Sequence, residues 1–244
     1  MEGTSRPHLF GLLAGLFLAV GLVLSAVVFT GTWMRVSDAH SISVTGSARK
    51  NIRADLIVWR GAFSTEAATL LEAQRTLKAD LAKVEDFLRA KNLTNFVVSA
   101  IAIQELYGRP EPSGAAQKTV GYRLSQTVEI RSEDVARLHL LAGETTALVE
   151  QGVAFVPAPP EYIYTKASEA KIEMLAEATK DARARAEQIA AQGGRQLAGL
   201  RSARMGVFQI TPLYSNETSW SGVNDTTSIE KTITATITAS FSMK

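Results

Sequence analysis

Histidines and a regularly spaced acidic series are the residues whose types could support catalysis or metal binding. His8 and His40 flank an apolar N-terminal segment, and His139 lies between two leucines in a segment with helical spacing. A general base needs a nucleophile within hydrogen-bond reach, and no pattern in the sequence places one near His139. We therefore predict that His139 is structural, and that the chain is not an enzyme.

The acidic series consists of Glu173, Glu177 and Asp181, which recur every four residues in a predicted helix. A metal site is one interpretation of this spacing. Lys180 and Arg185 are close enough in the same helix to pair with these carboxylates, which favours a solvated charged face. We predict no metal ion and no cofactor.

Composition excludes several further classes of function. The chain has no cysteine, which rules out disulfides, zinc ribbons, iron–sulfur clusters and thiol catalysis. It also lacks the sequence motifs of nucleotide-binding loops, zinc proteases and serine hydrolases. The net charge of +2, from 26 basic and 24 acidic residues, argues against binding of nucleic acid, which needs a basic excess on one face.

The N-terminal segment from Leu9 to Phe29 predicts a transmembrane helix. It carries no charged residue and is long enough to cross the roughly 30 Å hydrocarbon core of a bilayer. A cleaved signal peptide is the alternative, but its apolar region runs only about 7–15 residues and ends at small residues. The bulky end of this segment, Val27 to Phe29, favours an uncleaved single-pass anchor. Arg6 and the terminal amine precede this segment and Arg35 alone follows it, so the positive-inside rule slightly favours a cytosolic N-terminus.

Gly11, Gly15 and Ala19 lie on one face of this segment, at a spacing of four residues. Such a face of small residues could bring two membrane helices into close contact. Glycine is also common in membrane helices for other reasons, so this candidate packing face has two interpretations.

The sequence predicts four segments: a tail at 1–8, the anchor at 9–29, a linker at 30–40 and one α+β domain at 41–244. Strands follow from alternation of apolar and polar residues, and helices from apolar residues at helical spacing. Alternation favours a mainly antiparallel sheet with helices packed on one face. Strands are expected at 41–48, 55–63, 95–107, 119–131, 153–165, 200–210 and 229–243, helices from 64 to about 91 and at 133–150 and 168–192, and a polar turn at 49–53.

The last strand has two distinct faces. Its apolar row runs from Ile229 to Met243 and is interrupted by Lys231 alone. The opposite row is rich in small hydroxyl side chains, which either face solvent or pack against another subunit. We chose the second interpretation as a candidate interface, formed by Thr232, Thr234, Thr236 and Thr238.

Tyr214 and Trp220 lie in a predicted polar loop before this strand, with Phe208 shortly before it. Exposed aromatic side chains often anchor protein contacts. We therefore add Tyr214 and Trp220 to the candidate interface, with packing onto the domain's own core as the alternative.

Several segments together resemble the SIMPL domain family of bacterial envelope proteins. They are SISVTGSA at Ser41 to Ala48, Asp55 at the start of a strand, Gly121-Tyr122-Arg123, and the helical run from Asp181 to Glu187. Ala54 departs from the family pattern, which often has proline there. The resemblance implies export across the bacterial inner membrane and homo-oligomeric assembly in at least some members; it implies no catalytic residue.

We therefore predict a non-enzymatic protein of the bacterial inner membrane, whose domain faces the periplasm and self-assembles or mediates protein interactions. The alternative is a small-ligand-binding or envelope stress-protection protein with a pocket that the sequence does not reveal. The predicted partners are the membrane and further copies of the chain, and any small-molecule ligand is unknown.

The anchor prediction is tested by fractionation and N-terminal sequencing. Because an uncleaved helix stays in the bilayer, the protein is expected in the membrane pellet after carbonate washing, with Met1 or Glu2 at its N-terminus. A mature chain beginning between Thr30 and Ser41 would contradict an anchor. A reporter fused after Lys244 should be active outside the cytosol, and cytosolic activity would reverse the topology.

Overall fold

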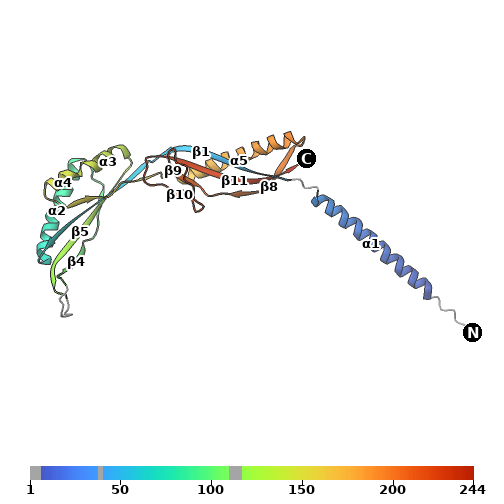
Figure 1. The fold of residues 1–244 in the computed structure, drawn as a ribbon, viewed down its shortest axis with the longest axis horizontal. Coiled ribbons are helices and arrows are strands. Elements are labelled where there is room, and N and C mark those ends of the chain that lie inside the picture. The colour runs from blue at the N-terminus through green and yellow to red at the C-terminus, as the bar shows by residue number, and fades with distance from the viewer. Residues whose placement is uncertain (1–6, 38–40, 110–116) are drawn as a thin grey trace, which may run out of the picture. The chain divides into compact units, whose positions relative to one another are not determined.

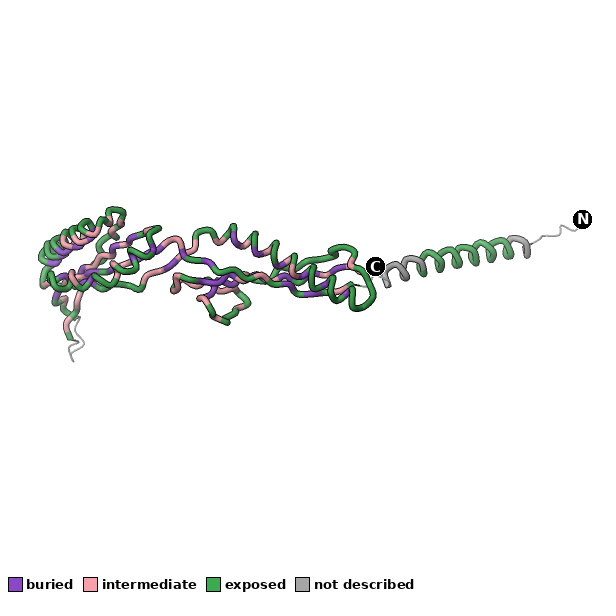
Figure 2. Tube along the Cα trace, turned by 90° about the horizontal axis from the view of Figure 1, so that it is seen from above, coloured by how far each residue is buried: buried purple, intermediate pink, exposed green. Residues whose placement is uncertain are grey.

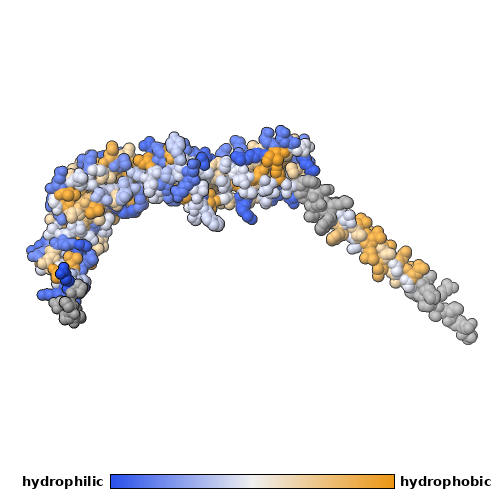
Figure 3. Space-filling model, in the orientation of Figure 1, coloured by the Kyte–Doolittle hydropathy of each residue, from blue (hydrophilic) through white to orange (hydrophobic). Residues whose placement is uncertain are grey.

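The computed structural model describes residues 7–37, 41–109 and 117–244, with only the backbone of 7–10 and 31–37. Residues 1–6 of the predicted tail (1–8), residues 38–40 of the predicted linker (30–40) and residues 110–116 lie outside the described residues. The N-terminal apolar segment forms helix α1 (Pro7–Ser37). Within it, Gly11–Thr30 is long and apolar enough to cross a membrane, and its side chains are exposed and mostly apolar (Figures 2 and 3). A membrane anchor and a secretion signal share these properties.

The described chain divides into two compact units, and its strands form two sheets (Figure 1). Unit 1 comprises residues 1–47, 175–206 and 236–244, and unit 2 comprises 48–174 and 207–235. Three long elements contribute residues to both units: β1 (Ser41–Arg53), α5 (Ala167–Gln192) and β11 (Glu230–Met243).

Unit 1 consists of a small sheet with α5 packed against it. Here β11 lies between β1 and the antiparallel strand β8 (Leu197–Met205), with Ile237 opposite Met205. The apolar row of β11 is buried, as at Ala239 and Phe241. The buried stripe of α5 in this unit consists of alanines: Ala178, Ala182, Ala186 and Ala190.

These alanines let the α5 backbone approach β1 very closely at Gly46. A Cβ atom on Gly46 would lie 2.2 Å from the carbonyl oxygen of Ala178 and 2.4 Å from the amide nitrogen of Ala182. Next to this contact, the backbone amide of Ser47 donates to the Asp181 carboxylate at 2.8 Å. The helix is therefore fixed on the sheet by close packing and by a hydrogen bond at the same point.

Unit 2 contains a larger antiparallel sheet, centred on β2 (Leu56–Ala67) and β5 (Thr119–Ser132). These two strands pair along their whole length, from Ile57 opposite Ser132 to Ala67 opposite Tyr122. The shorter strands pair at their outer edges: β3 (Phe96–Val98) and β4 (Ala102–Tyr107) on β5, and β6 (Phe155–Pro157) and β7 (Glu161–Ile163) on β2. A second group of unit 2 strands joins β11: β9 (Gln209–Pro212), which pairs with it directly, and β10 (Val223–Asn224), which pairs with β9.

Helices supply the other side of the unit 2 core. Helix α2 (Leu70–Ala90) begins at its cap Thr69, whose hydroxyl accepts from the amide of Glu72, and it buries Leu77, Val84 and Leu88. The rest of the helical cover is α3 (Val135–Ala142), the 3-10 turn η1 (Gly143–Thr145) and α4 (Thr146–Glu150). The core around Trp59 and Phe63 lies between these helices and the sheet.

The fold class predicted from the sequence is confirmed: antiparallel sheets, helices and an N-terminal apolar helix are all present. The polar turn predicted at 49–53 is wrong, because β1 continues to Arg53 with Ile52 buried and Lys50 paired with Glu173. The strand predicted at 95–107 is two short strands, and the helix predicted at 133–150 is interrupted by η1 at Gly143. The sequence did not predict these two interruptions, because the period of the apolar residues does not change where the strand or the helix is interrupted.

The contact at Gly46 gives a stability prediction. Gly46→Ala places a methyl group against helix backbone that has no side chain to rotate away, so we expect a loss of about 2–3 kcal/mol in the free energy of unfolding. Gly199→Ala, in strand β8, is the matched control, because a Cβ atom there meets nothing within 4 Å. Its effect should lie within about 0.5 kcal/mol. Denaturant titration of the full chain in detergent measures both, and equal midpoints for the two variants would contradict the packing described.

Candidate functional site

The four threonines predicted as an interface lie in different surroundings. Thr232 is buried and its hydroxyl donates to the Asn51 side-chain oxygen at 3.2 Å, while Thr234 is half-buried. Both line a cleft of about 330 Å³ in unit 2, together with residues 213–218 of the loop that follows β9. In unit 1, Thr236 is half-buried and Thr238 is exposed. The structure therefore leaves Thr238 open on the surface and encloses Thr232.

The two aromatic side chains of the predicted interface project into solvent. Tyr214 is 91% exposed and Trp220 is 90% exposed. The Trp220 loop is held by the buried Gln209, whose side-chain oxygen accepts from the amides of Ser219 and Val223 and whose nitrogen donates to the Ser219 carbonyl. Trp220 is thus presented by an ordered turn, without packing on the core of its own chain.

The predicted helix-packing residues Gly11, Gly15 and Ala19 are exposed along α1. A Cβ atom at either glycine would meet nothing within 4 Å. This face is unoccupied within one copy, and its use in contacts between membrane helices stays a prediction.

His139 has a partner that the sequence did not indicate. Its Nδ1 atom lies 2.5 Å from the Tyr162 hydroxyl, and burial raises the pKa of Tyr162. The predicted acidic series has partners too: Glu173 binds Lys50 at 2.6 Å, and Asp181 binds Arg185 at 2.9 Å. Within residues 7–37, 41–109 and 117–244, no group of three or more His, Asp or Glu side chains is placed to hold a metal ion.

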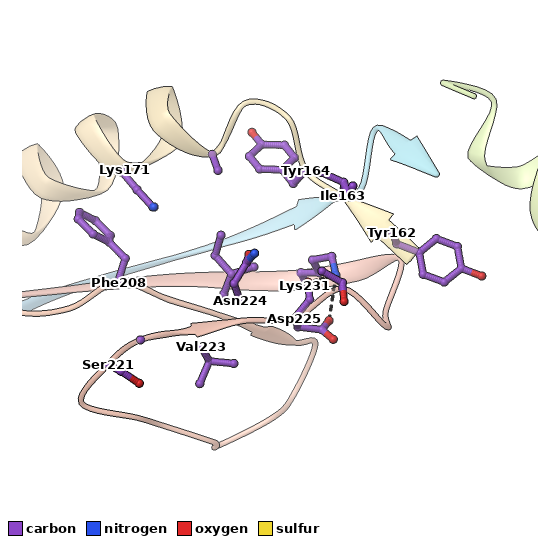
Figure 4. Close-up of a pocket in the computed structure, with 14 residues that line it drawn as sticks. Tyr162, Ile163, Tyr164, Lys171, Phe208, Ser221, Val223, Asn224, Asp225 and Lys231 are labelled. Atoms are coloured by element: carbon purple, nitrogen blue, oxygen red, sulfur yellow. Dashed lines mark hydrogen bonds and ion pairs between the residues drawn. The ribbon is translucent and has the colours of Figure 1, made fainter. Parts of the chain in front are cut away.

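Unit 2 contains a cavity of about 420 Å³ that the sequence did not reveal (Figure 4). Strand β7, the start of α5, strands β9 and β10 and the start of β11 all contribute to its wall. The signal that could have revealed it is Lys231, the residue that interrupts the apolar row of the last strand. Lys231 is only 1% exposed, and a lysine is almost never buried to this extent without a partner.

The partner of Lys231 is Asp225, in the segment between β10 and β11. The Lys231 ammonium group donates to the Asp225 carboxylate at 2.9 Å and to the Asp225 backbone carbonyl at 2.5 Å. The same carboxylate also accepts from the amide and the hydroxyl of Thr227, at 2.9 and 2.7 Å. The charges of Lys231 and Asp225 therefore compensate each other inside the protein.

Burial by itself would raise the pKa of Asp225. The hydrogen bonds from Thr227 and the ammonium group of Lys231 outweigh burial and lower this pKa from 3.8 to about 2. The aspartate is consequently ionised at neutral pH, which a buried carboxyl group without such partners would resist.

The opposite wall of the cavity is formed by the beginning of α5 and the aromatic side chains near it. The ammonium group of Lys171 lies 5.8 Å from the centre of the Phe208 ring, a cation–π geometry. In Figure 4, Lys171 extends from α5 and Asn224 from β10 towards the space between these elements, and Tyr164 lies beside them. The cavity thus combines cationic, amide and aromatic groups, a combination typical of small-ligand sites.

Comparison with known proteins gives one family. The family model SIMPL, described as a protein of unknown function (DUF541), matches residues 42–241, which include both units. No curated protein matches the chain.

The Lys231–Asp225 pair predicts a specific dependence of stability on pH. Because the pKa of Asp225 is lower in the folded protein, its contribution is complete above about pH 4 and is lost as the pH falls towards about 2. The shift corresponds to about 2 kcal/mol. Asp225→Asn should have a lower free energy of unfolding than the wild type at neutral pH. The difference between the two should shrink by about this amount between pH 4 and pH 2.

Denaturant titrations at a series of pH values measure this difference. Asp86→Asn is the control: this carboxylate lies on the surface of α2, where its ion pair with Arg89 at 3.5 Å is open to solvent, so its difference from the wild type should change much less over the same range. If the difference between Asp225→Asn and the wild type were constant with pH, the carboxylate would not be held ionised by its partners.

Proposed function

Because the chain belongs to the SIMPL family, with an apolar N-terminal helix outside the matched region, we propose that it is a non-enzymatic, single-pass protein of the bacterial inner membrane whose periplasmic domain self-assembles. Export is what the resemblance to this family implies. An uncleaved helix would then keep the domain at the outer surface of the inner membrane.

The observation that carries the assembly proposal is the exposure of strand β8. From Ala198 to Met205 every residue of this strand is exposed, although successive side chains point to opposite faces. Leu200 is 52% exposed and Met205 is 56% exposed. Among the described strands β8 pairs with β11 alone, so its other edge, apart from Arg201, has backbone groups available for another strand. Long exposed edge strands with apolar side chains are sites of association between chains.

Strand β1 supplies a second edge in the same unit. Among the described strands it pairs only with β11, on the side opposite β8. Two different edges on one small sheet suit a head-to-tail contact, in which β8 of one copy meets β1 of the next. A contact of this kind generates a ring if the rotation closes and a filament if it does not.

Two further features support assembly. Thr238 lies on the open, hydroxyl-rich side of β11, where small side chains permit close approach of a neighbouring sheet. A membrane anchor confines the copies to one surface, which raises their effective concentration and favours weak contacts. Trp220, exposed on an ordered turn, would serve as an additional anchor for a protein partner.

Absence of catalysis is part of the same proposal. The candidate base His139 contacts the Tyr162 hydroxyl, and the ionised groups of the cavity, Lys231 and Asp225, bind each other. None of these contacts joins a base to an activated nucleophile. A second function, binding of a small ligand, is favoured by the cavity itself and is developed below.

Substitutions in β8 test the assembly proposal. Leu200→Lys combined with Met205→Lys places two charges on the exposed strand, and we expect the full chain in detergent micelles to shift from oligomer to monomer in light scattering. Circular dichroism should stay unchanged, because both side chains are already exposed. Leu140→Lys, at an exposed position on α3, is the control and should leave the mass unchanged.

Thr238→Arg in the same assay separates the hydroxyl face from the strand edge. Loss of the oligomer in this variant as well would show that both surfaces contribute. A wild-type chain that is monomeric at all concentrations, in micelles and in reconstituted bilayers, would overturn the proposal.

A further inference from the structure

We propose that the unit 2 cavity between α5 and strands β9 and β10 binds a small organic anion with a single negative charge on a flat apolar body, such as an aromatic carboxylate. The cavity is about 420 Å³, within the range of small-ligand sites and large enough for a ligand of one or two rings. This inference does not depend on self-assembly.

The charges in the cavity wall select an anion. Its charged residues are Lys171, Lys231 and Asp225. Lys231 and Asp225 compensate each other, which leaves the positive charge of Lys171. Lys171 has no carboxylate partner within the described residues: Glu173, two residues away on α5, is engaged by Lys50. One uncompensated cation matches one negative charge and disfavours both cations and dianions.

Lys231 offers a hydrogen-bond donor in the wall of the cavity. An ammonium group has three donors, and Asp225 accepts two of them in this structure. The third has no acceptor among the described protein atoms, although the group is almost completely buried. A buried ammonium N–H without an acceptor lowers the stability of the protein. A ligand that places an acceptor atom at this point would therefore gain binding free energy.

The beginning of α5 favours the same sign of charge. Ala167, the first residue of this 26-residue helix, lines the cavity, and the first amide groups of a helix carry a partial positive charge. Together with Lys171 one turn further on, this end of the helix provides a favourable position for a carboxylate group.

Aromatic side chains in the cavity wall favour a ligand with a flat apolar body. Phe208 and Tyr164 both line the cavity, Phe208 from the residue before β9 and Tyr164 from the segment before α5 (Figure 4). Ile210 and Val223 add aliphatic surface. A planar ring between such groups buries apolar area while its acidic substituent reaches Lys171 and the donor of Lys231.

The experiment compares 2-naphthoate with its neutral amide, 2-naphthamide, by calorimetry on the full chain in a non-ionic detergent. The two probes share one ring system and differ in charge. We expect 2-naphthoate to bind at least about tenfold more tightly, because a carboxylate forms a charge-assisted hydrogen bond with an ammonium group, which is roughly twice as strong as the bond that a neutral amide forms. Equal affinities, or no binding of either probe below millimolar concentration, would overturn the proposal.

Variants locate the binding. Lys171→Gln should weaken 2-naphthoate about tenfold without changing 2-naphthamide, and Phe208→Leu should weaken both probes alike. Lys180→Gln is the matched control, because Lys180 is on the same helix but outside the cavity wall. A loss of 2-naphthoate binding in Lys180→Gln equal to that in Lys171→Gln would overturn the assignment. So would inorganic phosphate at neutral pH that bound more tightly than 2-naphthoate.

Discussion

The close approach of helix α5 to strand β1 at Gly46 is the constraint on which unit 1 depends. The helix backbone occupies the volume of a side chain at this position, so only glycine fits on the strand and only small residues, Ala178 and Ala182, fit on the helix. The hydrogen bond from the Ser47 amide to Asp181 fixes the register of the two elements at the same point. The edges of β1 and β8 and the hydroxyl face of β11 belong to the sheet that this contact fixes on α5.

The residues that carried the resemblance to SIMPL proteins have structural roles of this kind. Asp55 accepts from the amide and the hydroxyl of Thr165, just before α5, at 2.7 and 2.9 Å. A Cβ atom on Gly121 would lie 2.8 Å from the Ala67 carbonyl oxygen, so this position requires a close approach of two strands. The shared pattern therefore encodes how the elements pack together. This explains why it predicted the architecture but no catalytic or ligand-binding residue.

Elements with a regular period could be predicted from the sequence, and features formed by distant residues could not. The alternation of β11 and the helical spacing of apolar residues over 168–192 predicted a strand and a helix close to their observed bounds. The continuation of β1 through its charged residues was missed, because the partner of Lys50 is Glu173, far along the chain. The cavity was missed for the same reason: Lys231 was visible as an exception, but its enclosure depends on β7, β10 and α5, which only tertiary structure brings together.

The buried ion pair is itself an argument for function at this cavity. Removing two charges from water costs several kcal/mol, and apolar residues of similar volume often stabilise a protein as well as such a pair does or better. Ile233, two residues along the same face of β11, and Ile229, just before the strand, are apolar, so the fold accepts aliphatic side chains along this row. An apolar pair in place of Lys231 and Asp225 would therefore stabilise the protein about as well. The pair instead places a buried ammonium donor beside the cavity. The carboxylate of Asp225 holds this donor in position and cancels its charge. Lys171 is then the residue that sets the net charge of the cavity wall.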